Sequence, residues 1–230
     1  MTGTDHDAHQ PADTVPATTN EEDDDMTATL EHPALETVHD ATDTLVGLPT
    51  DLDDIDAQIH AELDFLTSLI WSPATAAAIH ALVGDHQHRD STGGYPADRI
   101  PMNHPLFLSP IHGRIFRTVV ELVDEGAPVT PQILMTRIGT TDRAARQTLI
   151  TIAAPTGHGP LPGGSDVPYL SRGIVDAYYR RGYTALLARM QIALEDADTD
   201  DLAGHWTTLT NHQQAAERRR FAVTDALAKL

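Results

Sequence analysis

Histidine is the residue type in this chain whose side chains most readily bind metals. There are 13 histidines, and the densest group is His86 and His88, with His80 nearby. Structural zinc needs three or four ligands in fixed geometry. Two histidines two positions apart in an irregular, polar stretch do not supply that set. We therefore interpret these histidines as solvent-exposed and predict no metal site.

Acid–base, nucleophilic and phosphate-transfer chemistry are not indicated either. General acid–base catalysis needs carboxylates held in a cleft, whereas the carboxylates of the central region fall on expected polar helix faces: Glu62, Asp64, Glu121, Asp124 and Glu125. The chain has no cysteine, which excludes thiolate ligands and cysteine nucleophiles. A phosphate-binding loop GxxxxGK[ST] needs a lysine, and the single lysine, Lys229, follows an alanine. We predict no catalytic residue, no cofactor and no P-loop ATPase activity.

Charge is distributed unevenly along the 230 residues. Residues 1–60 hold 16 of the 34 acidic residues and no Lys or Arg, so they carry −16, while 15 basic and 18 acidic residues leave the rest at −3. Residues 1–50 are too polar to bury a core, and we predict a disordered acidic tail or, alternatively, an acidic tail that engages a basic partner. Because duplex-binding domains usually show a basic face, we expect direct DNA binding to be weak or absent. Without a signal peptide or a long apolar run, we expect a cytoplasmic protein.

The elements that would position any site are helices. Apolar residues recur at helical spacing from Leu52 to Ile70, and no stretch alternates like a strand. Ser or Thr followed by Pro marks three helix starts, at residues 72–73, 109–110 and 130–131, and Thr141 is expected to cap a fourth helix. Expected helices span about 52–70, 74–83, 110–125, 131–138, 142–154, 167–197 and 202–220. The prediction is an all-α fold: a tail at 1–50, a helical bundle at 51–165, a long antiparallel helical hairpin at 166–220 and a C-terminal tail at 221–230.

One pair of these helices permits a DNA-binding hypothesis. Residues 130–152 read as helix, Gly139 turn and helix, with Arg143 and Arg146 on the second helix, which is typical of a helix-turn-helix. The other interpretation is a helix pair packed in the core of the bundle.

Three segments resemble the N-terminal, all-helical domain of DnaB-type replicative helicases. They are Ala61–Glu62 through Ile70, the stretch Pro105–Phe116 continuing to Val129 and Leu134, and Tyr169–Leu170 with Tyr179–Arg180–Arg181. The resemblance covers about 160 residues. It implies structural roles for Phe107, His112, Ile115, Phe116, Gly126, Pro128 and Val129. Residues 84–103 are longer and more polar than that family's link, and the ATPase motor of those helicases is missing.

The resemblance also implies where partners would bind, since hairpins of that family pair between subunits to build a collar. The expected interface residues are Tyr178, Tyr179, Arg180, Arg181, Tyr183, Leu187, Met190, Leu194 and Trp206. From the residues alone, core packing of the hairpin is the competing interpretation of the tyrosines and arginines. The end of the chain, 221–230, reads as a frayed tail or as a docking peptide.

Three hypotheses about function follow. The first is a non-enzymatic replication accessory protein that self-associates, as a dimer or larger oligomer, and docks onto a helicase, a primase or a loader. The second is a helix-turn-helix regulator using residues 130–152. The third is a remnant of a helicase gene with no present activity.

Overall fold

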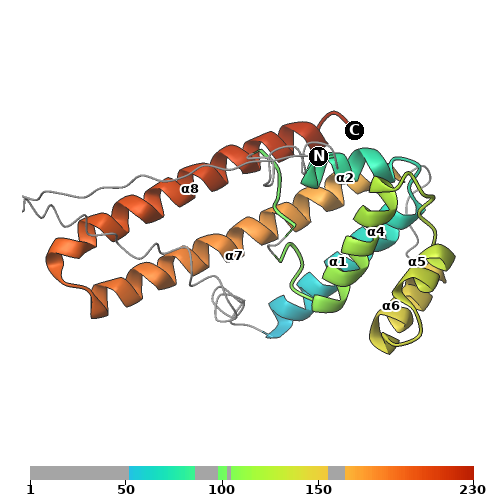
Figure 1. The fold of residues 1–230 in the computed structure, drawn as a ribbon, viewed down its shortest axis with the longest axis horizontal. Helices are drawn as coiled ribbons and strands as arrows, with labels where there is room; N and C mark the ends of the chain where they lie inside the picture. Colours follow the sequence, from blue (N-terminus) through green and yellow to red (C-terminus); the bar gives the residue numbers. More distant parts are fainter. Residues whose placement is uncertain (1–51, 86–97, 103–104, 155–163) are drawn as a thin grey trace, which may run out of the picture. The chain divides into compact units, whose positions relative to one another are not determined.

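The computed structural model describes residues 52–85, 98–102, 105–154 and 164–230. Within these ranges the chain forms seven helices and no strand, so the all-α fold is confirmed. The helices are α1 Leu52–Trp71, α2 Thr75–Val83, α4 Pro110–Asp124, α5 Pro131–Ile138, α6 Arg143–Ala153, α7 Val167–Asp196 and α8 Thr199–Leu227 (Figure 1). The tail predicted at 1–50, His86, His88 and the segment 155–163 lie outside the described residues.

Capping chemistry explains most of the helix starts. The Ser109 hydroxyl accepts a hydrogen bond from the His112 N–H at 3.3 Å, and Thr130 does the same for Ile133 at 3.3 Å, each followed by proline in the first turn. Gly126 and Gly139 follow the ends of α4 and α5 with φ of 67° and 75°, a region that costs glycine little.

Two of the predicted caps were wrong. Ser72 does not cap α2: its hydroxyl accepts from the Ala74 N–H at 3.0 Å within a turn, and α2 begins two residues later than the Ser–Pro pattern predicts. Asp142, rather than Thr141, caps α6, because its carboxylate accepts from the Ala145 N–H at 3.0 Å. At α6 two adjacent short polar side chains could accept from the same free backbone donor, whereas α2 has no side-chain cap.

The core lies among α1, α2, α4, α6 and the ends of the hairpin. Three phenylalanine rings meet at its centre: Phe107 and Phe116 have centroids 5.0 Å apart, and Phe65 lies 6.0 and 6.4 Å from them. Leu134, Leu149 and Ile152 bring α5 and α6 into the same core. The helix pair at 130–152 therefore contributes directly to the bundle.

The hairpin consists of α7 and α8, which pack against each other in antiparallel fashion (Figure 1). Helix α7 also contacts α1, and α8 contacts α2, so both helices are anchored in the bundle at the same end. We predicted a last helix running toward Arg220, with continuation to the end of the chain as the alternative, and that alternative is closer to the observed helix. It continues to Leu227, because Val223 and Leu227 are 0% and 1% exposed in the core. Residues 221–227 are thus part of the folded unit rather than a tail.

Candidate functional site

A buried carboxylate joins α1 to the start of α4. Glu62, on the inner face of α1, is 1% exposed. Its carboxylate accepts hydrogen bonds from the Leu108 N–H, from the Ser109 N–H at 3.1 Å and from Nδ1 of His112 at 3.0 Å. The two backbone donors are amides that precede α4. Glu62 therefore fixes the entry of α4 from a helix about 46 residues earlier in the chain.

Arg181 of α7 holds the same segment from the other side. Its Nη2 donates to the carbonyl oxygens of Leu106 at 2.7 Å and Pro105 at 3.4 Å. Burial lowers the pKa of the Arg181 guanidinium, and the charge of nearby Glu62 acts in the opposite direction. We call Glu62, His112 and Arg181 the buried clamp.

The buried clamp contains a histidine–carboxylate pair, the combination that acts as a general base in many enzymes. Here His112 is 5% exposed and Glu62 is 1% exposed, and the Glu62 oxygens are occupied by the chain's own donors. No hydroxyl of the described residues is hydrogen-bonded to the imidazole as a nucleophile would be. The geometry favours a structural role, in which a buried polar network sets the relative positions of α1, α4 and α7, although Nη1 of Arg181 has no hydrogen-bond partner among the described residues.

Metal chemistry gains no support in the parts of the chain that the structure describes. No three His, Asp or Glu side chains there lie close enough to share an ion. His80 is exposed on α2, and the predicted behaviour of His86 and His88 stays a prediction.

The predicted interface residues divide into two groups. Those near the bundle contact their own chain: Tyr178 and Tyr179 meet edge to face at 5.1 Å, and the Tyr183 hydroxyl donates to Glu217 of α8. Burial raises the pKa of Tyr179 well above the usual tyrosine range. Together with Arg181, these tyrosines pack within the hairpin and against the bundle. The core-packing interpretation describes their positions better than an intermolecular interface does.

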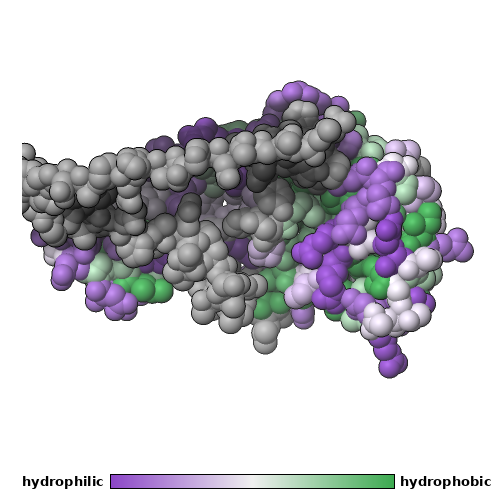
Figure 2. Space-filling model, in the orientation of Figure 1, coloured by the Kyte–Doolittle hydropathy of each residue, from purple (hydrophilic) through white to green (hydrophobic). Residues whose placement is uncertain are grey.

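The second group lies toward the turn between α7 and α8 and is open to solvent. Leu187, Leu194 and Trp206 are 72%, 60% and 61% exposed. Ile192, which was not among the predicted interface residues, is 54% exposed. Figure 2 shows a hydrophobic area over this end of α7, beside hydrophilic surface. We call Leu187, Ile192, Leu194 and Trp206 the tip patch.

The tip patch exists because the α7–α8 contact uses a different face of the helix. Leu187 and Leu194 are two turns apart and share a face, while Leu186 and Ala193 are rotated about 100° away and are more covered. Met190 is half-buried between these faces, and Arg180 is exposed. The Trp206 side chain, on α8, is exposed as well.

The family-signature residues are placed mainly in the core. Phe107, His112, Ile115 and Phe116 are buried. Gly126 adopts a positive φ, Val129 is half-buried and Pro128 is exposed. The motif around residues 105–116 thus builds the core and the buried clamp.

The helix pair at 130–152 has few arginine side chains that are free to contact DNA. Arg146 donates to the carbonyls of Met135 and Gly139, both at 3.3 Å, and so caps α5. Arg137 pairs with Glu125, and Arg114 pairs with Asp142 at 2.8 Å. Arg143 remains exposed. Arginines used to join helices are poorly placed to contact phosphates, which weakens the helix-turn-helix hypothesis.

The described helices include none long and apolar enough to cross a membrane. Comparison with known proteins leaves the resemblance as a hypothesis: no family model, no curated protein and no solved structure matches this chain.

Proposed function

We propose that the protein is a non-enzymatic replication accessory protein that self-associates through the tip patch and docks onto a helicase, a primase or a loader. The observation that carries the docking part is the tip patch itself. Four large apolar side chains, each at least 54% exposed, occupy the end of a hairpin whose other end is anchored in a core. Large apolar side chains gathered in the open at one end of an otherwise well-packed protein favour an interaction site there.

Charge around the tip patch favours a specific contact over general stickiness. Acidic side chains border it on both helices and are exposed: Glu195, Asp196, Asp198, Asp200 and Asp201. An apolar centre with a polar, charged rim is the usual anatomy of a protein interface. Like charges at the rim also oppose unordered stacking of hairpins and limit the geometries in which two copies can meet.

The replication part rests on the resemblance to the DnaB N-terminal domain. The fold supports it in one respect: Glu62 and Arg181 come from two of the resembling segments, and both contact the third, which contains His112. Three segments that resemble the same domain also meet at one place in this fold. In this proposal the protein acts without ATP hydrolysis, as a platform to which other proteins bind.

Size-exclusion chromatography with light scattering tests self-association. We expect a dimer or larger species at micromolar concentration, and dissociation to monomer in the Leu187→Ser, Leu194→Ser double variant. The matched control is Ile150→Ser, which removes a 49% exposed apolar side chain from α6, away from the hairpin. If the wild-type chain remains monomeric at about 100 µM, any self-association is weaker than most functional contacts, and the self-association proposal is overturned.

The partner is tested separately, by co-purification with the helicase, primase and loader of the host. The replication proposal predicts recovery of one of these proteins with wild-type chain. Loss of that recovery in the double variant assigns it to the tip patch. Recovery of none of them, with self-association intact, would remove the replication assignment and leave the assembly module.

A further inference from the structure

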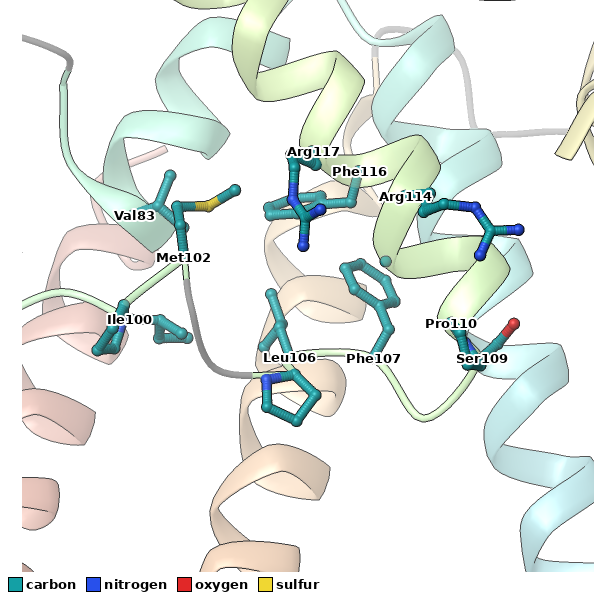
Figure 3. Close-up of a pocket in the computed structure, with 13 residues that line it drawn as sticks. Val83, Ile100, Met102, Leu106, Phe107, Ser109, Pro110, Arg114, Phe116 and Arg117 are labelled. Atoms are coloured by element: carbon teal, nitrogen blue, oxygen red, sulfur yellow. The ribbon is translucent and has the colours of Figure 1, made fainter. Parts of the chain in front are cut away.

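A cleft of about 250 Å³ lies on the bundle, between α4 and the segment before it (Figure 3). Its lining is mostly apolar and comes from the end of α2, from residues 100–102 and 105–109, and from α4. The residues that form its floor are buried: Ile100, Leu106, Phe107 and Phe116. The volume lies below the roughly 300–1,000 Å³ typical of sites for drug-sized ligands and cofactors. It suits one or two side chains of a peptide.

The cleft offers few backbone groups for hydrogen bonding. Pro101, Pro105 and Pro110 line it, and proline has no N–H. The carbonyls of Pro105 and Leu106 are occupied by Arg181. The amides of Leu108 and Ser109 are occupied by Glu62. Because the proline rings are stiff and the neighbouring backbone is fixed by the buried clamp, little ordering is needed when a ligand enters.

One charged group extends into this apolar cleft. In Figure 3 the Arg117 side chain reaches from α4 over the middle of the cleft, whereas Arg114 turns away from it. Arg114 is paired with Asp142, but Arg117 has no ion-pair or hydrogen-bond partner among the described residues. A guanidinium beside an apolar floor can bind a ligand that carries a carboxylate next to an apolar side chain.

We propose that this cleft is a docking site for an acidic–apolar peptide segment of a partner protein. A Leu, Met or Phe side chain would enter the floor between Met102 and Phe107, and an adjacent Asp or Glu would pair with Arg117. This goes beyond the proposed function, because the cleft lies on the bundle and its occupant is a peptide rather than a second hairpin. Either proposal can fail while the other stands.

The chain provides an unusual variant for blocking the cleft without damaging the fold. Gly113 lines the cleft from within α4, and a Cβ added there meets nothing within 4 Å. Gly113→Leu should therefore fill the cleft while replacing a poor helix former with a good one. Its melting temperature should equal or exceed that of the wild type, which would show that any lost binding is not unfolding.

A phage-displayed library of random 12-residue peptides, selected against the full chain, tests the proposal. We expect enrichment of sequences with an apolar residue flanked by Asp or Glu. A synthetic copy of an enriched peptide should bind the Gly113→Leu variant and the Arg117→Glu variant at least about 10-fold more weakly than it binds the wild type. In Arg117→Glu this corresponds to the loss of one charge-assisted contact. Fluorescence anisotropy measures both.

Two controls separate this result from general charge and from the tip patch. Arg143→Glu makes the same charge change at an exposed arginine of α6 and should leave the affinity within about two-fold, as expected for a distant surface charge. Leu187→Ser should likewise have no effect on peptide binding. Failure to enrich acidic–apolar sequences, or an affinity unchanged by both Gly113→Leu and Arg117→Glu, would overturn the proposal.

Discussion

Replacing Glu62 with alanine tests whether the buried clamp sets the fold. The substitution leaves the amides of Leu108 and Ser109 and the imidazole of His112 without their acceptor, and it leaves the Arg181 guanidinium without its nearby opposite charge. Hydrogen bonds to charged groups contribute about 1.5–3 kcal/mol each, and removing one partner of a buried charge pair costs about 3–5 kcal/mol. Because these terms overlap, we expect a loss of about 4 kcal/mol in the free energy of unfolding.

Glu62→Gln should cost less, about 2 kcal/mol, because it keeps the volume and one acceptor oxygen but presents an NH₂ to a backbone donor. The measurement is urea denaturation followed by circular dichroism. Amide hydrogen exchange at Leu108 and Ser109 should become faster in both variants. Asp64→Ala, at an exposed position on the same helix, is the control and should change stability by no more than about 0.5 kcal/mol. A cost below about 1 kcal/mol for Glu62→Ala would refute the reasoning.

Three further predictions concern stability and pH. The Tyr179 hydroxyl is buried without a hydrogen-bond partner among the described residues, so Tyr179→Phe should be neutral or stabilising by up to about 1 kcal/mol at pH 7 in urea denaturation. Burial raises the folded-state pKa of Tyr179 above the ordinary value of 10.0, so wild-type stability declines as pH rises above 10.0, where the unfolded chain loses the tyrosine proton first. Tyr179→Phe should therefore resist alkaline unfolding better than wild type. An equal loss of stability with pH in both proteins would contradict this. Hydrogen bonds from the Ala145 N–H and then from Arg114 lower the pKa of Asp142. Its contribution to folding stability is therefore present at neutral pH and is lost as pH falls below the ordinary value of 3.8. Between pH 5 and pH 3, the melting temperature of Asp142→Asn, measured by calorimetry, should change less than that of the wild type. Gly164 has φ of 67° and an added Cβ would lie 2.6 Å from the Ser72 Cβ, so Gly164→Ala should cost about 2–4 kcal/mol, whereas Gly173→Ala, with open space around its Cβ, should not destabilise.

The helices could largely be predicted because their signals are local. Ser109 and Thr130 each precede a proline, and the structure uses both hydroxyls as caps. The error at Thr141 arises because the adjacent Asp142 can satisfy the same donor, and the error at Ser72 arises because α2 begins after the turn that the Ser72 hydroxyl stabilises. Which hydroxyl or carboxylate lies within hydrogen-bond distance of the free N–H depends on the folded backbone geometry.

The buried clamp could not be predicted from residue types. Glu62 lies in a helix that also carries acidic residues on its exposed face, such as Asp64, and no periodicity distinguishes a carboxylate that meets three donors from one that meets water. Its partners lie 46–50 residues away, and Arg181 is further along still. The tip patch was partly predictable: Leu187, Leu194 and Trp206 were among the interface residues that the resemblance implies, but which face of α7 packs on α8 depends on tertiary contacts.

The burial of Val223 and Leu227 has a consequence for how the chain is made. The ribosome delivers α1 first, yet the core around α2 lacks two of its apolar side chains until residue 227 has been synthesised and has left the exit tunnel. During translation, therefore, α2 has no α8 to pack against. The nascent chain would present an incomplete apolar surface until the last turns of α8 emerge and close over it.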